Sequence, residues 1–360
     1  MREKRASTLT SRLVWLLSLV PIALTVLPLL KTAKWWVRLW DYPRQQLAAT
    51  LALTGALQAL ALPRRRATAG LGAATAASLA WQAWQIAPYT RLHRAQVREA
   101  ERADVANAVG LLIANVYQDN RDVDRFLRRI DEVDPDVILA VETDHWWDAR
   151  LVVALAERYR HAVRHPLDNT YGLHLFSRLE LRDVRVTDRV TRDIPSVFAR
   201  VVLRSGEEIA LYGLHPRPPQ IGDDVDQRDA ELLLVAREVE TAPHRVIVCG
   251  DLNDVAWSHT TRLFQRISGL LDPRVGRGLY PTFHADHWLA RWPLDHVFHG
   301  AAFRLERLQV LGHIGSDHFP VYVRLVFDPA APAVQAAPAA DRTDHREASA
   351  KIREGVATSR

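Results

Sequence analysis

The sequence predicts a mixed α/β sandwich that follows three transmembrane helices. Three observations predict this fold. Three charge-free hydrophobic stretches occupy residues 1–90, and short apolar runs alternate with amphipathic segments over residues 105–327. Polar residues of a few chemical types also stand at the ends of six of these apolar runs. Alternating strands and helices are typical of sheets that carry helices on their faces.

The three hydrophobic stretches are residues 13–30, 45–63 and 67–90. Each approaches the roughly 20 residues that a helix needs to cross a hydrocarbon core. The second and third stretches are rich in Ala and less hydrophobic, so buried helices of a soluble bundle are the alternative. A cleaved signal peptide is a further alternative for residues 1–30, but the two later stretches and the lack of a clean cleavage site count against it.

Positive charges in the short loops predict the orientation, because cytoplasmic loops carry the excess of Lys and Arg. The amino-terminal flank and the second loop carry seven such residues, and the first loop carries four. They are Arg2, Lys4, Arg5, Arg12, Arg64, Arg65 and Arg66 on one side, and Lys31, Lys34, Arg38 and Arg44 on the other. We therefore expect a multi-pass membrane protein with a cytoplasmic amino terminus and an extracytoplasmic module.

Two segments flank this module. Residues 91–104 carry arginines at spacings of three and four, which predicts a juxtamembrane helical linker with a basic face. These arginines are Arg91, Arg94, Arg98 and Arg102, and on the outer side of a membrane they count against the predicted orientation. Residues 328–360 combine Ala, Pro and charge without apolar periodicity, so we expect a disordered tail.

Overall composition sets few limits on function. The formal net charge of +5 suits a phosphate-bearing partner or an anionic membrane surface, but it is too small to identify either. Cys249 is the single cysteine of the chain, so no internal disulfide can form.

Within the module, the elements follow one another in a regular order. Apolar runs predict strands at residues 109–116, 136–141, 173–176, 197–203, 209–214, 246–249, 296–298, near 308 and at 321–327. Apolar residues on one face predict a helix at residues 120–130, and further helices are expected at residues 147–159, 226–239 and 257–267. Asn120 is expected to cap the first of these helices.

The polar residues at the ends of the strands are of types used in metal and phosphate chemistry. They are Asn115, Glu142, His215, Asp251 with Asn253, Asp295, and Asp317 with His318. A hard divalent cation prefers oxygen ligands, and a water that attacks phosphorus needs a carboxylate to take its proton. One polar strand end means little, but six of them can meet on one rim of a sandwich, which predicts a single site.

The order and spacing of these motifs resemble those of the endonuclease/exonuclease/phosphatase superfamily, which includes DNase I, apurinic endonucleases, sphingomyelinases and inositol-polyphosphate 5-phosphatases. The resemblance spans roughly residues 105–327. It rests on Asn115-Val116, Pro135 to Glu142, Gly172 to Ser177, His215-Pro216, Gly250-Asp251-Leu252-Asn253, Leu294-Asp295-His296 and Ser316-Asp317-His318. It implies a four-layer α/β sandwich of two facing mixed sheets, with the site at one end.

The resemblance also implies a metal site. Glu142 would be the main ligand of Mg²⁺ or Mn²⁺, Asn115 would orient the site, and Asp317 would complete the ligands directly or through water. The alternatives are a carboxylate that starts a helix for Glu142 and a turn-forming residue for Asn115.

The resemblance implies catalytic roles for the remaining residues. Asp251 would accept a proton from the attacking water, and Asn253 would position that water or the phosphate. His318 would donate to a phosphate oxygen while Asp295 holds its imidazole oriented and positively charged, and His215 would contact the phosphate. An Asx turn after a strand is the alternative for Asp251 and Asn253, and a structural histidine is the alternative for His215.

The expected function is that of a membrane-anchored, divalent-metal-dependent phosphoesterase in which water attacks phosphorus in line. The architecture resembles a membrane-bound bacterial branch of the superfamily, including glycopeptide-resistance proteins proposed to act on lipid-carrier pyrophosphates. A lipid-linked phosphate is therefore an expected substrate. A membrane-tethered nuclease and a non-catalytic binding protein are the alternatives. The non-catalytic alternative is less favoured because every expected site position still carries a suitable residue.

The loops near the site bear on the choice of substrate. Residues 165–171 and 274–292 contain a few arginines but no dense basic run, so nucleic acid is a less favoured partner. Four tryptophans near the site strands are candidates for its rim or for core packing: Trp146, Trp147, Trp288 and Trp292.

Overall fold

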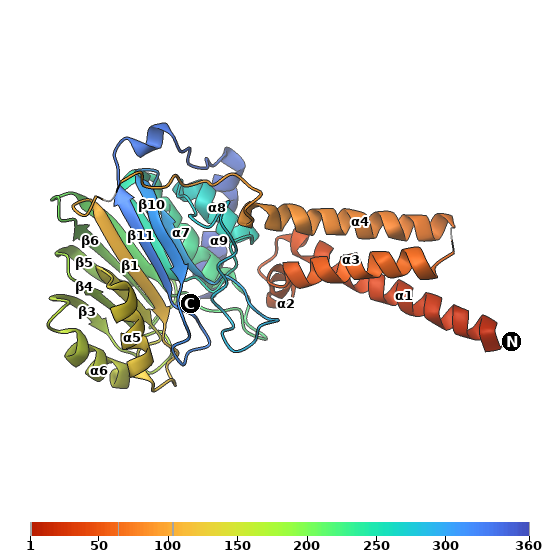
Figure 1. Cartoon of the computed structure of the whole chain (residues 1–360), viewed down its shortest axis with the longest axis horizontal. Helices are drawn as coiled ribbons and strands as arrows, with labels where there is room; N and C mark the ends of the chain where they lie inside the picture. The colour runs from red at the N-terminus through yellow and green to blue at the C-terminus, as the bar shows by residue number, and fades with distance from the viewer. Residues whose placement is uncertain (1, 64, 103, 360) are drawn as a thin grey trace.

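The computed structural model describes residues 2–63, 65–102 and 104–359. Arg64 and the side chains of Arg2, Lys4 and Arg5, which entered the charge count, lie outside the described part. A helical bundle projects from one end of an α/β sandwich, and the amino terminus lies at the far tip of the bundle (Figure 1).

The sandwich contains two mixed sheets within the described residues. The six-stranded sheet has the order β10-β11-β1-β2-β4-β3, and the five-stranded sheet has the order β5-β6-β7-β8-β9. The first sheet comprises β1 (Ala108–Asn115), β2 (Val137–Val141), β3 (His161–His165), β4 (Leu173–Ser177), β10 (Phe303–Val310) and β11 (Val321–Phe327). The second comprises β5 (Leu181–Asp188), β6 (Pro195–Val202), β7 (Glu208–Leu214), β8 (Val246–Asp251) and β9 (Asp295–His299).

Helices cover the outer face of each sheet, which completes the four predicted layers. α5 (Val123–Val133) and α6 (His145–Leu155) pack on the first sheet. α7 (Asp226–Glu240), α8 (His259–Ser268) and α9 (Arg342–Thr358) pack on the second, and η4 (Pro243–Arg245) and η5 (Ala331–Ala333) are short connections.

The apolar run of strand β1 is explained by its position between two cores. Leu111 and Ile113 belong to the core between the two sheets, whereas Leu112 packs with Phe126 and Ile130 of α5. Both faces of the strand are therefore buried, and each large aliphatic side chain contributes about 1.5–3 kcal/mol by leaving water.

One local expectation is wrong, and two strands were missed. Asp122 caps α5 in place of Asn120, because the Asn120 side chain instead donates to the carbonyls of Val116 and Ile314, both at 3.0 Å. Edge strands β3 and β5 were not predicted, since most of their side chains are exposed or half-buried and carry no clear apolar pattern.

The described part of the predicted linker, residues 91–104, consists of turns and bends with one isolated bridge, between Glu99 and Leu305, and is not helical. Its backbone is bound to the sandwich, since Ala100 N–H donates to the Leu305 carbonyl at 2.8 Å and Leu305 N–H donates to the Arg98 carbonyl at 2.9 Å. Val97 is fully buried. Pairing with the sandwich therefore outweighs the helical spacing of the arginines.

The carboxyl-terminal segment, residues 328–360, is also not the disordered tail that was expected, because its described part contains α9. The Asp341 side chain caps this helix, and Ile352 packs into the core of the second sheet's helical layer. Lys351 Nζ lies 2.8 Å from the buried carboxylate of Asp229. This helix packs against the sandwich through small side chains and ion pairs. Its sequence therefore lacks the broad apolar stripe that would have predicted a packed helix.

The three hydrophobic stretches all form helices: α1 (Arg2–Val26) with η1 (Leu27–Leu30), α3 (Arg44–Ala61) and α4 (Arg66–Ile86). Among the described residues, however, one stretch alone, Leu9–Leu30, is long and apolar enough by itself to cross a membrane. The expectation of three such helices is corrected on this criterion, because Ala, Gly, Thr and Gln lower the hydropathy of α3 and α4.

The loop between α1 and α3, residues 31–43, is here called the bundle loop. It contains α2 (Trp35–Arg38) and η2 (Leu39–Asp41), while η3 (Ala87–Tyr89) follows α4. The bundle loop docks on the sandwich, since Lys34 Nζ lies 2.6 Å from Asp224 and Trp257 Nε1 donates to the Asp41 carbonyl at 2.7 Å. The end of α3 and the start of α4 lie at the opposite end of the bundle (Figure 1).

Candidate active site

The six-stranded sheet brings two predicted residues together through its register. β1 and β2 run parallel with Asn115 opposite Val141, so Glu142 follows beside Asn115. Asn115 Nδ2 donates to Glu142 Oε1 at 2.7 Å. Ser316 Oγ donates to the Asn115 carbonyl at 2.8 Å, which fixes the loop before β11 at the same edge.

The five-stranded sheet brings three further predicted residues together through its register. β7 and β8 are parallel with Leu214 opposite Gly250, so His215 lies beside Asp251. β9 is antiparallel to β8 and places Asp295 opposite Asp251.

The two sets meet across the gap between the sheets. Asn115 Nδ2 lies 3.1 Å from Asp251 Oδ2, and His318 Nε2 lies 3.5 Å from the same oxygen. His215 Nε2 lies 3.8 Å from Asp251 and 3.9 Å from Glu142. The structure thus gathers all eight predicted residues at one end of the sandwich: Asn115, Glu142, His215, Asp251, Asn253, Asp295, Asp317 and His318.

The turn after β8 aims Asp251 and Asn253 into the site. Gly250 has φ 138°, and a Cβ there would lie 1.9 Å from the Leu214 carbonyl oxygen, so this position requires glycine. Asn253 N–H donates to Asp251 Oδ1 at 2.9 Å, which forms the Asx turn considered as an alternative. Because Asp251 Oδ2 faces the site, the turn and a catalytic role are compatible. Burial raises the pKa of Asp251, whereas the nearby His318 charge opposes the rise.

His318 and Asp295 form a buried ion pair. His318 Nδ1 lies 2.8 Å from Asp295 Oδ2. Burial alone would lower the pKa of His318, but the charges of Asp295 and Asp251 outweigh it and raise the pKa to about 10. The imidazole is therefore positively charged at neutral pH and can donate through Nε2 to an anionic oxygen.

His215 has a different environment from His318. It is 3% exposed, and its Nδ1 has no hydrogen-bond partner among the described residues. Burial lowers its pKa, although the charge of Asp251 opposes this. A neutral imidazole between Glu142 and Asp251 can donate one hydrogen bond without adding charge.

The donor groups fit a hard divalent cation. Asp251, Asp295 and His318 place potential ligand atoms within 4.8 Å of one another, and the buried Asp295 Oδ1 has no partner among the described residues. Glu142 and Asp317 add carboxylates to the same pocket. Since His318 Nδ1 is engaged by Asp295 and the ring is charged, the carboxylates are the better ligands. Burial raises the pKa of Glu142, while the hydrogen bond from Asn115 and the charge of His318 oppose the rise.

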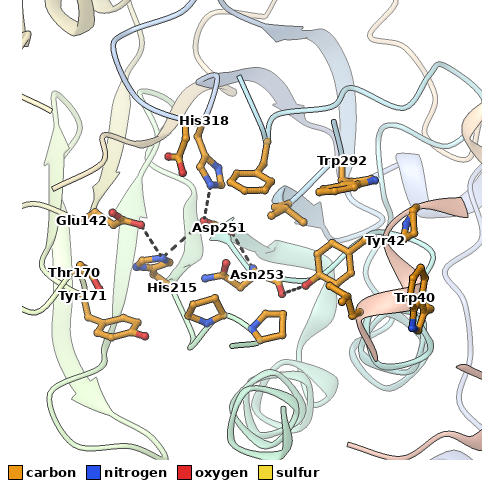
Figure 2. A pocket seen from close by; sticks show the side chains of 17 residues that line it. Trp40, Tyr42, Glu142, Thr170, Tyr171, His215, Asp251, Asn253, Trp292 and His318 are labelled. Atoms are coloured by element: carbon orange, nitrogen blue, oxygen red, sulfur yellow. Dashed lines mark hydrogen bonds and ion pairs between the residues drawn. The ribbon is translucent and has the colours of Figure 1, made fainter. Parts of the chain in front are cut away.

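The pocket has a volume of about 420 Å³ and two chemically distinct halves (Figure 2). Its polar half is lined by the predicted residues Glu142, His215, Asp251, Asn253, Asp317 and His318. Its apolar half is lined by Leu39, Trp40, Tyr42, Pro43, Pro218, Pro219, Phe283, Trp292 and Leu294. The first four come from the bundle loop, so the helical bundle contributes one wall of the pocket.

Sequence reasoning missed this wall. The available signal was a cluster of aromatic residues in a loop that only had to connect two helices, including Trp40 and Tyr42. Of the four tryptophans considered, Trp292 lines the pocket, whereas Trp147 is buried in the core under α6. Trp288 is 77% exposed, and Trp146 packs beneath the guanidinium of Arg150.

Residues 112–318 match the model of the Endonuclease/Exonuclease/phosphatase family, and the chain belongs to that family. The fold and the family are those of hydrolases acting on phosphoester bonds. No curated protein sequence matches the chain.

Solved structures share the fold. An endonuclease/exonuclease/phosphatase from Beutenbergia cavernae is 18% identical, with 62% of this chain and 72% of that chain covered and a TM-score of 0.51. The human Nocturnin catalytic domain with bound sulfate is 17% identical, with 61% and 94% covered and a TM-score of 0.50. Humanized D. rerio TDP2 is also 17% identical, with 61% and 99% covered and a TM-score of 0.50.

Proposed function

We propose that the chain is a membrane-anchored, divalent-metal-dependent phosphoesterase that hydrolyses a lipid-linked phosphate ester or anhydride. The observation that carries this proposal is the two-part pocket. One half presents carboxylates and a charged imidazole, which suit a phosphate and a metal ion. The other half is apolar and is built partly by the bundle loop, which suits the first carbons of a lipid chain.

The residues at the polar end have the chemistry for in-line attack by water. The Asp251 carboxylate is buried, and its raised pKa makes it a better proton acceptor for the attacking water. His318 donates from Nε2 to a phosphate oxygen, and Asp295 keeps its ring charged and oriented. Asn253 positions the water or the phosphate, and His215 contacts the phosphate from the other side.

Glu142 and Asp317, with Asn115 orienting Glu142, would hold Mg²⁺ or Mn²⁺. When bound, such an ion polarises a phosphoryl oxygen and neutralises negative charge.

Leu9–Leu30 is the one candidate span among the described residues, and the interior of the bundle supports the proposal that α3 and α4 enter the membrane beside it. Gln58 Nε2 donates to Ser18 Oγ and to Thr75 Oγ1, both at 2.8 Å, and Gln82 Nε2 donates to Thr25 Oγ1 at 3.0 Å. These five side chains are at most 7% exposed. Helices in lipid bury polar side chains against one another, whereas a soluble bundle buries apolar ones.

The exterior of the bundle supports the same conclusion. Large apolar side chains lie on its surface, including Leu13 at 54%, Leu16 at 60%, Leu53 at 62% and Leu60 at 85% exposed. The bundle loop and the sandwich lie at one end of the bundle, and the end of α3 and the start of α4 lie at the other, so the charge difference between the loops favours an extracytoplasmic sandwich.

Protease treatment of intact spheroplasts tests on which side of the membrane the sandwich lies. Cleavage in the sandwich is expected, and full protection of residues 105–327 would reverse the assignment.

A substrate panel tests the function. The full-length protein in detergent is assayed with a prenyl pyrophosphate, plasmid DNA and a sphingomyelin-type phosphodiester, each with Mg²⁺ or with EDTA. We expect Mg²⁺-dependent hydrolysis of the prenyl pyrophosphate above the others. Preferred cleavage of DNA would indicate a tethered nuclease, and no hydrolysis of any compound would indicate a binding module.

A further inference from the structure

A second pocket, of about 230 Å³, lies where the bundle meets the sandwich. Its lining residues come from η1, the bundle loop, the start of α3, the end of α4, and α8 with the residues just before it. They are Pro28, Leu29, Lys31, Asp41, Arg44, Trp81, Trp84, Gln85, Trp257, His259, Arg262 and Arg266. It shares no lining residue with the active-site pocket. Figure 1 shows α4 reaching the sandwich beside α8.

The charge available in this junction pocket is positive. Neither Lys31 nor Arg262 has a carboxylate within ion-pair distance in the described part of the chain, and the Arg262 guanidinium is held by neutral partners, Gln85 of α4 and the Tyr89 hydroxyl. The nearby carboxylates are already paired. Asp41 Oδ1 lies 2.5 Å from Arg44, and Asp344 lies 2.8 Å from Arg266.

Two buried N–H groups of this pocket lack an acceptor, whereas Asp41 Oδ2, which also has no hydrogen-bond partner among the described residues, is ion-paired with Arg38 at 2.9 Å. Arg44 is 3% exposed, yet its Nε has no acceptor within the described residues. Trp81 Nε1 is likewise buried without an acceptor there. Two unpaired cations beside two unsatisfied N–H groups match an anion with several acceptor oxygens.

The rim of the pocket is apolar and exposed. Leu29 is 48%, Leu30 is 66% and Trp84 is 60% exposed, and the rings of Trp81 and Trp84 lie 5.1 Å apart. The Arg262 guanidinium lies 5.7 Å from the Trp84 ring. Tryptophans and basic residues at the end of a bundle are typical of the level of lipid headgroups.

We propose that the junction pocket binds the phosphate headgroup of an anionic phospholipid, with the acyl chains lying along Leu29, Leu30 and Trp84. Lys31 and Arg262 pair with the phosphate, and Arg44 Nε and Trp81 Nε1 donate to its oxygens. The bound lipid would bridge the bundle and α8. This inference rests on the proposed membrane anchoring and is independent of the proposed catalytic activity.

Thermal unfolding of the full-length protein in non-ionic detergent tests the proposal. The protein is titrated with micelles containing phosphatidylglycerol, with micelles containing phosphatidylcholine, and with inorganic phosphate alone. We expect phosphatidylglycerol alone to raise the unfolding midpoint, by several degrees, because it binds the folded state. The Lys31→Gln/Arg262→Gln variant should bind it about tenfold more weakly or worse, since it loses two charge-assisted contacts.

Two controls separate a lipid site from general charge effects. Arg192→Gln removes one charge from a 92% exposed side chain on the sandwich and should keep the full shift. Lys31→Gln alone removes an exposed side chain, so it reports on binding even if the double variant folds poorly. An unchanged shift in Lys31→Gln and the double variant, or an equal shift with phosphatidylcholine or inorganic phosphate, would overturn the proposal. Prenyl pyrophosphate hydrolysis, measured separately, reports on the proposed function alone.

Discussion

The Tyr42 hydroxyl, in the bundle loop, donates a hydrogen bond to the Asn253 carbonyl at 2.7 Å. Arg228 Nη1 donates to the same carbonyl, also at 2.7 Å. Tyr42, which lies just before α3, thus holds the turn from Asp251 to Asn253 in place. The bundle is therefore part of the structure of the candidate active site as well as its anchor.

Removing this hydrogen bond should impair turnover. We expect Tyr42→Phe to lower kcat several-fold, about tenfold at most, because a buried neutral hydrogen bond contributes about 0.5–1.5 kcal/mol. Tyr159→Phe is the matched control, since it removes a similar bond, 2.9 Å to the Pro135 carbonyl, from another part of the sandwich. Steady-state kinetics with the prenyl pyrophosphate measures both variants, and an equal loss in the two would argue against a positioning role for Tyr42.

Trp40 should act on the lipid part of the substrate. It lines the apolar half of the pocket, so Trp40→Ala is expected to raise KM for a long-chain prenyl pyrophosphate about tenfold, with little effect on a short soluble phosphoester. Trp288→Ala, at a side chain that is 77% exposed and outside the pocket, serves as control. Equal effects of Trp40→Ala on both substrates would count against an apolar subsite.

Asp295 should contribute to catalysis by keeping the His318 imidazole charged and oriented. Asp295→Asn removes the charge that lies 2.8 Å from the imidazole while keeping the size of the side chain. We expect kcat/KM to fall by about 10²–10³, in the range found when one stabilising donor is lost. A matched loss from His318→Gln, with no further loss in the double variant, would show that the pair acts as a unit. Additive losses would contradict this coupling.

Glu231 of α7 predicts how stability depends on pH. It is fully enclosed, its Oε1 has no partner among the described residues, and burial raises its pKa to about 8. The folded protein therefore holds a proton that the unfolded chain releases near its ordinary pKa of 4.5. The contribution of Glu231 to stability therefore falls as the pH rises from about 4.5 to 8 and then levels off.

Replacing the carboxyl group of Glu231 should remove its contribution to the pH dependence of stability. Glu231→Gln is expected to be more stable than the wild type at pH 9, by up to about 4 kcal/mol, with little difference at pH 5. Thermal unfolding at the two pH values measures this. Glu238→Gln is the control on the same helix, because Glu238 is 46% exposed and paired with Arg189. The same pH profile in wild type and Glu231→Gln would contradict the assignment.

The sequence allowed the sandwich and its site to be predicted because their signals are local. Gly250 and Asp251 end the buried strand β8 and Asn253 follows it, and the register then brings parallel strand ends to one edge. Helix α5 was predictable from Phe126 and Ile130, which lie one turn apart on its buried face.

The parts that could not be predicted depend on contacts between distant segments. α9 docks through pairs such as Lys351 with Asp229, which are 122 positions apart. Trp40 joins the pocket only because the bundle loop docks on the sandwich. The polar interior of the bundle, such as Gln58 between Ser18 and Thr75, lowers its hydropathy although it fits a membrane.

Phosphate release from a long-chain prenyl pyrophosphate by the full-length protein tests the central claim most directly. The wild type should release phosphate with Mg²⁺ and not with EDTA. Asp251→Asn should lower the rate by at least about 10² while the unfolding midpoint without metal stays close to that of the wild type. Hydrolysis by Asp251→Asn at the wild-type rate, or a wild-type rate that EDTA leaves unchanged, would contradict the account.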